Sequence, residues 1–137
     1  MQPTTLPPSR IAEILQHYHA NCPALEAVVV AAYDGTLLGH WGQLPAPLTA
    51  RAAARLGVTL PPAMALVRPS PLTESLIWAP PAVWYWAQLE QRQVLLACCM
   101  STEHAGALRL AGQLAVQQLL AAQLPPAPQT PAVDAAP

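Results

Sequence analysis

The sequence predicts an α+β sandwich in which a five-stranded antiparallel sheet carries helices on both faces. Two observations lead to this fold class. Segments with helical apolar periodicity alternate with short apolar runs bounded by turn residues, in the order helix, strand, strand, helix, strand, strand, strand, helix. Consecutive strands followed by a helix are typical of an antiparallel sheet with helices packed against it.

The first element is a helix, predicted over residues 9–20. Its apolar residues recur at the i, i+3, i+4 and i+7 spacing of one buried helix face: Ile11, Ile14, Leu15 and Tyr18. Ser9 is the expected N-cap, because its hydroxyl can accept a hydrogen bond from a free backbone N–H group of the first turn. Asn21 and Pro23 are expected to end the helix.

A β-hairpin follows, with strands predicted over 26–33 and 36–41. The dipeptide Asp34-Gly35 separates two apolar runs, which is a strong hairpin signal because both central residues of such a turn need positive φ. The first strand is apolar on both faces, so we expect it to be a covered central strand.

A short Ala-rich helix is predicted over 48–56, with Gly57 just beyond its end. Residues 57–72 are rich in proline, so we expect a short helical turn over 63–66 and then an extended linker. Three strands and a final helix complete the domain, at 73–78, 83–89, 93–100 and 102–124. Ser101 or Thr102 is the expected cap of that helix. Its apolar residues surround most of its circumference, which indicates burial on more than one side.

Charged residues make up only 9% of the chain, against roughly 25% in an ordinary soluble domain, and the net charge is −1. This balance gives no electrostatic attraction to a nucleic acid, and no segment is apolar enough to predict membrane insertion. No signal peptide is recognised in the first residues, and the three cysteines do not suggest a disulfide framework, so we expect a cytoplasmic protein. The proline-rich segments 1–8 and 125–137 are expected to be flexible tails around a folded domain at 9–124.

Four local features together resemble the roadblock family, named for a dynein light chain. An amphipathic helix leads directly into an apolar strand, the strand ends in Asp34-Gly35 followed by Thr-Leu-Leu, and a short Ala-rich helix comes next. The last strand, 94–100, leads into a helix that opens with Gly106 and Arg109. The sequence departs from the family at His104, where members often have Asn, and in its longer proline-rich segment at 57–72.

The resemblance implies a profilin-like sandwich that forms a non-catalytic homodimer by joining two sheets across a two-fold axis. It also implies a partner, because many roadblock-like proteins regulate or scaffold small Ras-like GTPases. The third strand would lie at the sheet edge where two protomers pair, so a dimer interface is expected at Leu76, Trp78, Trp84 and Trp86. Because Trp84 and Trp86 share one strand face, core packing under a helix is the alternative for these aromatics.

Arg51 and Arg55 lie four residues apart on the Ala-rich helix, so both point to one side of it. We expect them to contact an acidic partner surface, although a solvated helix face would give the same pattern. The resemblance does not support an arginine finger.

No catalytic set, cofactor or metal is predicted from the remaining residues. His17 and His19 point away from each other on a helix, which leaves His19 and Cys22 as too few ligands for zinc. Two other functions stay open: a small-molecule sensory module with a Trp-lined pocket between sheet and helices, and, as the weakest alternative, a thiol or metal enzyme at Cys98, Cys99 or His104.

Overall fold

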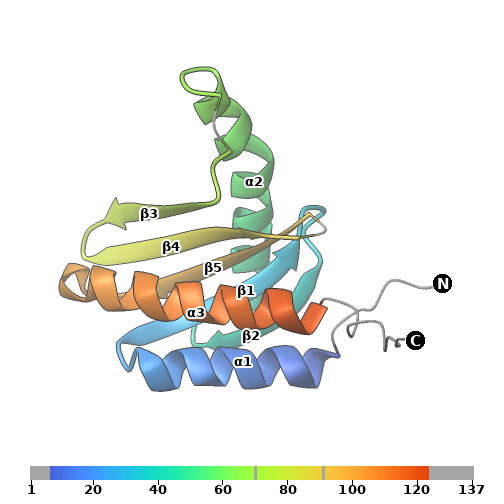
Figure 1. Ribbon diagram of the computed structural model, residues 1–137. Coiled ribbons are helices and arrows are strands. Elements are labelled where there is room, and N and C mark those ends of the chain that lie inside the picture. Colours follow the sequence, from blue (N-terminus) through green and yellow to red (C-terminus); the bar gives the residue numbers. More distant parts are fainter. Residues whose placement is uncertain (1–6, 70, 91, 124–137) are drawn as a thin grey trace, which may run out of the picture.

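The computed structural model describes residues 7–69, 71–90 and 92–123. The predicted tails therefore lie almost wholly outside the described residues. The element order is as predicted, with these bounds: α1 Pro8–Asn21, β1 Leu25–Ala32, β2 Leu37–Gly42, α2 Ala46–Ala65, β3 Glu74–Ala79, β4 Ala82–Leu89, β5 Gln93–Cys99, a 3-10 turn Thr102–His104 and α3 Ala105–Gln123 (Figure 1).

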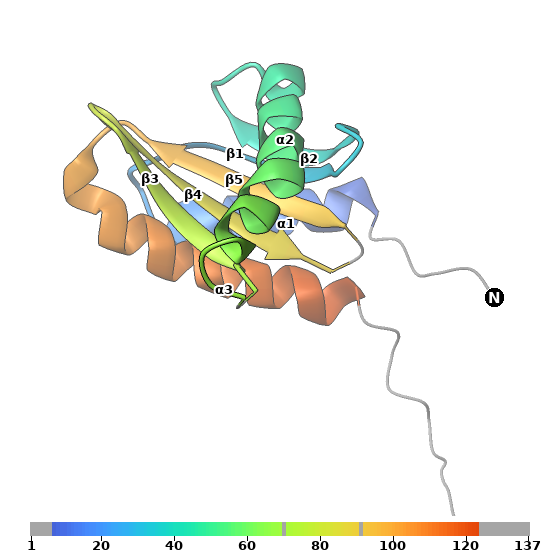
Figure 2. The ribbon, with the colours of Figure 1, turned by 90° about the horizontal axis from the view of Figure 1, so that it is seen from above.

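The five strands form one antiparallel sheet in the order β2-β1-β5-β4-β3. Helices α1 and α3 lie side by side on one face, and α2 crosses the other face (Figures 1 and 2). This arrangement confirms the predicted fold class, the interior position of β1 and the edge position of β3.

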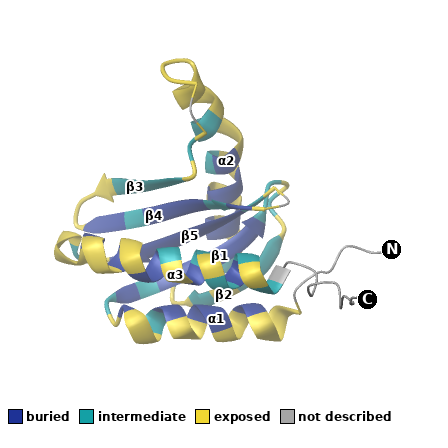
Figure 3. Ribbon diagram, in the orientation of Figure 1, coloured by how far each residue is buried: buried dark blue, intermediate teal, exposed yellow. Residues whose placement is uncertain are grey.

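The core has two layers because the interior strands are apolar on both faces. Val28 and Val30 of β1 point toward α1 and α3, whereas Val29 and Ala31 point toward α2. All four are at most 2% exposed, and β4 and β5 alternate in the same way. Figure 3 shows the buried interior of the sheet in dark blue between helices whose outer faces are exposed.

Two local predictions are wrong in detail. Helix α1 begins at Pro8 with Pro7 as its N-cap, so Ser9 lies inside the first turn and no side chain caps the helix. Proline at the first helical position supplies the φ of the turn and has no N–H to satisfy, and the Pro7 carbonyl oxygen accepts a bond of 3.0 Å from the Arg10 N–H. In the hairpin turn only Gly35 has positive φ (93°), and the Asp34 carboxylate accepts a hydrogen bond of 2.9 Å from the Thr36 N–H. That bond lowers the pKa of Asp34.

Helix α2 is longer than predicted, because Gly57 lies inside it and is not its C-terminal stop. A Cβ on Gly57 would lie 2.8 Å from the Tyr33 ring and 3.0 Å from Val94. The glycine is therefore required for close packing of α2 on the sheet, and the helix continues to Ala65. Pro61 and Pro62 lie within this continuation, where they remove two backbone donors from the last turns.

The Ser101 hydroxyl caps the turn before α3, accepting a bond of 3.3 Å from the Glu103 N–H as predicted. One stripe of α3 is buried against the sheet and α1, and includes Leu108, Ala115 and Leu119. The stripe that begins with Leu110 and Leu114 is 65% and 40% exposed, so the single chain does not bury α3 on more than one side.

The two glycines of α3 differ sharply in their surroundings, which gives a matched test of the packing. A Cβ on Gly112 would lie 2.5 Å from the Tyr85 ring and 2.6 Å from the Tyr18 hydroxyl, whereas a Cβ on Gly106 would meet nothing within 4 Å. We expect Gly112→Ala to lower the free energy of unfolding by about 2 kcal/mol, because rigid rings must move.

Gly106→Ala is the control for this pair. It removes the same backbone freedom without a clash, so it should raise the free energy of unfolding by up to about 1 kcal/mol. Urea denaturation of the two variants measures both effects. Equal stability of the two variants would contradict the close approach of α3 to Tyr85 and Tyr18.

Candidate protein-interaction site

The edge strand β3 is the first part of the candidate site. It pairs with β4 from Glu74↔Ala87 to Ala79↔Ala82, and no other strand of the described chain pairs with its outer side. An edge strand presents free N–H and C=O groups that can pair with another strand. This edge is thus available for association.

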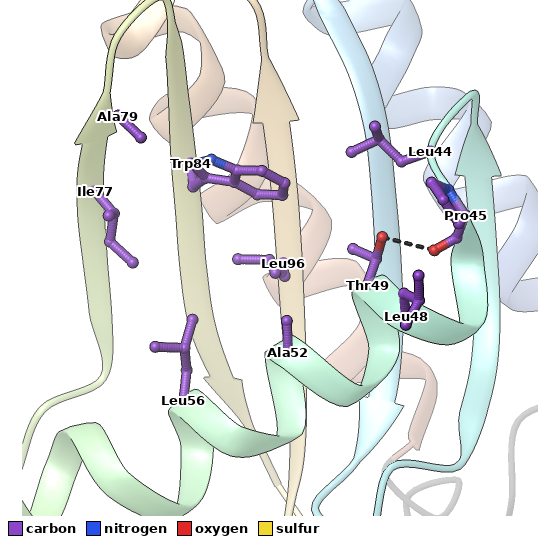
Figure 4. A pocket seen from close by; sticks show the side chains of 10 residues that line it. All are labelled: Leu44, Pro45, Leu48, Thr49, Ala52, Leu56, Ile77, Ala79, Trp84 and Leu96. Carbon is purple, nitrogen blue, oxygen red and sulfur yellow. Dashed lines mark hydrogen bonds between the residues drawn. The ribbon is translucent and has the colours of Figure 1, made fainter.

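An apolar groove lies beside this edge, between α2 and the sheet. Its volume is about 480 Å³. In Figure 4 the α2 side chains Leu48, Ala52 and Leu56 face Ile77, Trp84 and Leu96 of the sheet across this space. Leu44, Pro45, Thr49 and Ala79 complete the lining. The one hydroxyl among these side chains, that of Thr49, donates a bond of 2.8 Å to the Pro45 carbonyl oxygen, so the groove offers almost no polar contact.

The groove lies where the sensory-module alternative expected a Trp-lined pocket, between sheet and helix, and Trp84 lines it. Its wall on α2 was not singled out from the sequence, although a signal was present. Leu48, Ala52 and Leu56 recur at i, i+4 and i+8, which places them on one flank of a helix. Leu48 is 57% exposed, an unusual exposure for a leucine facing a groove.

The four residues predicted for a dimer interface do not form one patch. Trp86 is fully buried under α2, so it has no surface to offer a second protomer, and the core-packing alternative describes it correctly. Trp84 is half-buried and lines the apolar groove. Leu76 and Trp78 point to the other face of the sheet, where Trp78 is 54% exposed at the end of the edge strand.

Arg51 and Arg55 lie on the opposite flank of α2 from the groove. They line a second, more polar cavity of about 260 Å³ together with the hairpin residues Tyr33, Asp34 and Gly35. Both arginines are exposed, and neither forms an ion pair with a described residue. Arg92 lies nearby, with its guanidinium 5.1 Å from the centre of the Tyr33 ring. Half of the six cations of the chain therefore gather around this hairpin.

Glu74, at the start of β3, is the centre of a polar cluster that sequence reasoning did not single out. Its carboxylate accepts bonds of 2.7 Å from the Tyr85 hydroxyl, 3.0 Å from the Gln113 amide and 2.9 Å from the Arg109 guanidinium. Partial burial of the Glu74 carboxylate disfavours its charged form and by itself would raise its pKa. The bonds from Tyr85, Gln113 and Arg109, together with the Arg109 charge, nevertheless lower the pKa of Glu74. The cluster ties the edge strand to α3.

Of the residues considered for enzyme or metal chemistry, the three cysteines are buried, His19 is half-buried, and His17 and His104 are exposed. Burial raises the pKa of the Cys98 thiol to about 11, the opposite of the shift that a reactive thiolate needs. His19 stacks on Trp41 with ring centroids 4.3 Å apart, whereas His17 lies 3.1 Å from the Gln118 amide on α3. Within the described ranges no three His, Cys, Asp or Glu side chains gather as metal ligands. Among the helices of those ranges, none has the length and apolarity to cross a membrane.

No protein-family model and no curated protein matches the sequence. Solved structures do match over most of the chain. MglB from Myxococcus xanthus has 14% identity and a TM-score of 0.74, covering 93% of this chain and 99% of its own. An MglB with a tetrameric arrangement has 17% identity and a TM-score of 0.75, with coverages of 90% and 100%. A Roadblock/LC7 domain from Streptomyces avermitilis has 11% identity and a TM-score of 0.63, with coverages of 85% and 99%.

The chain therefore has the roadblock-type fold, which confirms the resemblance given by its sequence motifs. Sequence identities of 11%, 14% and 17% show a shared fold but no shared function. The groove, the edge strand and the arginine flank of α2 must be interpreted from their own chemistry.

The Glu74 cluster predicts a specific dependence of stability on pH. Because the folded state lowers the pKa of Glu74, its contribution is complete above the unfolded value of about 4.3 and is lost as the pH falls through the lower folded value. Glu74→Gln keeps the shape of the side chain and removes the charge. The variant should be less stable than wild type at pH 7, and the difference should shrink below about pH 4.

Urea denaturation across this pH range measures the difference. Glu13→Gln is the control, because Glu13 forms an exposed ion pair with Arg10 and surface pairs contribute little. A stability difference for Glu74→Gln that stays constant from pH 7 to pH 3 would show that the carboxylate charge does not stabilise the cluster.

Proposed function

We propose that the protein is a non-catalytic, cytoplasmic homodimer that regulates or scaffolds a small Ras-like GTPase. The observation that carries the proposal is the roadblock-type fold with an unpaired edge strand beside an open apolar groove. Roadblock-like proteins of related fold regulate or scaffold such GTPases. In this chain the unpaired edge strand is β3, and the apolar groove lies between α2 and the sheet.

Dimerisation through β3 is supported by the chemistry of the edge. Antiparallel pairing of two β3 strands would satisfy the free backbone groups and extend the sheet across a two-fold axis. Leu76 and Trp78 would then lie near the seam on one face, and Ile77 and Trp84 on the other. Self-association also occurs in a protein of this fold, the MglB with a tetrameric arrangement.

Arg51 and Arg55 are proposed as the contact for the GTPase. They are exposed on one flank of α2, they have no described ion-pair partner, and no carboxylate other than Asp34 lines their cavity. Two unpaired guanidinium groups attract an acidic surface, and such charges set the rate and specificity of association. The proposed role is positioning of the GTPase through surface contact, with no residue donated to its chemistry.

The dimer predicts a mass of 29 kDa in solution, twice the 14.5 kDa of the chain. Size-exclusion chromatography with light scattering measures it. Trp78→Ala should increase the monomer fraction, because Trp78 lies at the proposed seam and its exposed indole would be buried there.

The control for this prediction is His40→Ala, which removes a ring from the edge strand β2 at the opposite end of the sheet. It should leave the mass unchanged. A wild-type protein that stays monomeric at all concentrations would contradict the homodimer. A stronger effect of His40→Ala than of Trp78→Ala would move the interface to the other edge.

The GTPase contact predicts that Arg51→Glu with Arg55→Glu weakens binding to a GTP-analogue-loaded small Ras-like GTPase by at least about tenfold. Isothermal titration calorimetry with a panel of such GTPases measures the affinity. Both substitutions are at exposed positions, so the thermal stability should change little.

Arg10→Glu is the matched control, because it reverses an exposed charge on α1, across the sheet from α2. Absence of binding to every GTPase, combined with a large thermal shift on adding a small apolar metabolite, would instead favour the sensory module with a Trp-lined pocket. The groove volume lies within the range of ligand pockets, which is the observation that keeps this second function open.

A further inference from the structure

Tyr33, the first residue after β1, lines two cavities at one end of the sheet. One is the cavity of about 260 Å³ beside Arg51 and Arg55. The other, of about 320 Å³, is lined by Ala32, Tyr33, Asp34 and Arg92. The Tyr33 N–H donates a bond of 2.9 Å to the Arg92 carbonyl oxygen, and in Figure 1 the β1–β2 turn lies beside the start of β5. Arginines from α2 and from the turn before β5 are thus gathered around one aromatic side chain.

Arg92 has a backbone conformation that favours glycine. Its φ is 59°, in the left-handed region, and among the described residues it is the one non-glycine residue with positive φ. A Cβ in this region lies unfavourably close to the following carbonyl oxygen, a cost that glycine avoids. The arginine side chain instead lies over Tyr33, with its guanidinium 5.1 Å from the ring centre. Residues in such conformations cluster at binding sites, so the position indicates a use for the charge.

The Tyr33 hydroxyl has a proton to donate. It accepts a bond of 2.6 Å from the Gln88 side-chain amide on β4. A phenol hydroxyl can both accept and donate, and no described residue accepts the Tyr33 proton. The ring is half-buried and packs against α2 at Gly57, which holds the hydroxyl in place. A ligand with a hydrogen-bond acceptor would therefore find a positioned donor here.

The two cavities carry an excess of positive charge. None of their three arginines forms an ion pair with a described residue. Asp34 is the one carboxylate that lines them, and it accepts a bond from the Thr36 N–H in its own turn. Glu90, at the end of β4, is exposed and lines neither cavity. Three guanidinium groups beside one carboxylate favour an anion.

We propose that Arg51, Arg55, Arg92 and Tyr33 form a binding site for a small organic phosphate. Guanidinium groups bind phosphate oxygens through paired hydrogen bonds, and the Tyr33 hydroxyl supplies a further donor. The inference goes beyond the proposed GTPase contact, in which Tyr33 and Arg92 have no role, and it needs no GTPase to be tested. A bound phosphate would occupy Arg51 and Arg55, so it would compete with an acidic partner surface for them.

The size and the walls of the cavities determine the class of ligand. Their volumes of about 260 and 320 Å³ are at the small end of ligand pockets, which suits a small phosphate ester. Ala54 and Val58 complete the wall beside the α2 arginines, and Val58 is 51% exposed. These two side chains offer apolar contact to the organic part of the ester, which inorganic phosphate lacks.

Isothermal titration calorimetry of the isolated protein at constant ionic strength tests the site, with ribose 5-phosphate and pyrophosphate as probes. Wild type should bind both. Arg92→Gly should weaken binding by at least about tenfold, because a charge-assisted hydrogen bond is lost. It should not lower the melting temperature, because glycine suits the positive φ. Tyr33→Phe keeps the ring and should weaken binding by about tenfold.

Arg68→Gly is the matched control for Arg92→Gly. Arg68 is exposed and lines neither cavity, so this variant removes the same charge from elsewhere on the surface. It should bind both probes as wild type does. A short phosphoserine peptide, titrated under the same conditions, separates a free metabolite from a phosphorylated protein segment as the source of the phosphate group.

Each outcome supports or overturns the site. Absence of binding in wild type, or equal affinity in wild type, Arg92→Gly and Tyr33→Phe, would overturn it. A phosphoserine peptide that binds more tightly than both small probes would replace the small organic phosphate as the ligand. Binding of a GTPase without binding of either probe would leave the GTPase contact standing and overturn the phosphate site, and the reverse result would do the opposite.

Discussion

One helix has to cover the face of the sheet opposite α1 and α3, and this constraint determines most of the surface chemistry. The sheet has five strands whose interior members are apolar on both faces, so each face needs a cover. Helix α2 packs closely over β1 and β5, where Gly57 allows contact with Val94. It covers Trp86 of β4 but leaves the part of the β3–β4 hairpin near Ala79 uncovered, and Trp84, Ile77 and Leu96 line the groove that results.

The other face shows what complete coverage looks like in the same molecule. Two helices lie there side by side, and polar side chains join them to each other and to the sheet. The Tyr18 hydroxyl donates a bond of 2.7 Å to the Leu108 carbonyl oxygen, and Glu74 joins β3 to Tyr85 and α3. Burial raises the pKa of Tyr18, so this hydroxyl stays a hydrogen-bond donor. The groove has no equivalent connections, which suits a surface that a second molecule covers.

Much of the fold could be predicted from local sequence, because apolar periodicity and turn residues act over a few positions. The order of elements and the Ser101 cap follow from such signals. The edge position of β3 was instead an implication of the family resemblance. The end of α2 could not be predicted in this way. A glycine just after a periodic segment, here Gly57, predicts the end of a helix. Only its contacts with Tyr33 and Val94, which are distant in sequence, show that Gly57 is needed for close packing inside the helix. The tryptophans were assigned to a dimer interface because the family resemblance places β3 at the paired sheet edge. Alternation places Trp84 and Trp86 on one strand face, but it does not reveal how far α2 extends over that face. The Glu74 cluster joins residues 35 and 39 positions apart, beyond the range of any local pattern.

The low charge of the chain acquires a structural meaning from the three flanks of α2. One flank is buried on the sheet through Ala50, Ala53 and Gly57, one carries Leu48, Ala52 and Leu56 along the groove, and one carries Arg51 and Arg55 beside the hairpin. Charge is thus absent where a second copy is proposed to pack and present where an acidic partner is proposed to bind. Two uncharged surfaces recognise each other by shape and apolar area, so the dimer contact should be insensitive to salt, whereas the arginine contact should weaken as salt screens it. Because one helix carries both the groove wall and the arginine flank, pairing of a second protomer at β3 would also fix the position of the arginines relative to the joined sheet.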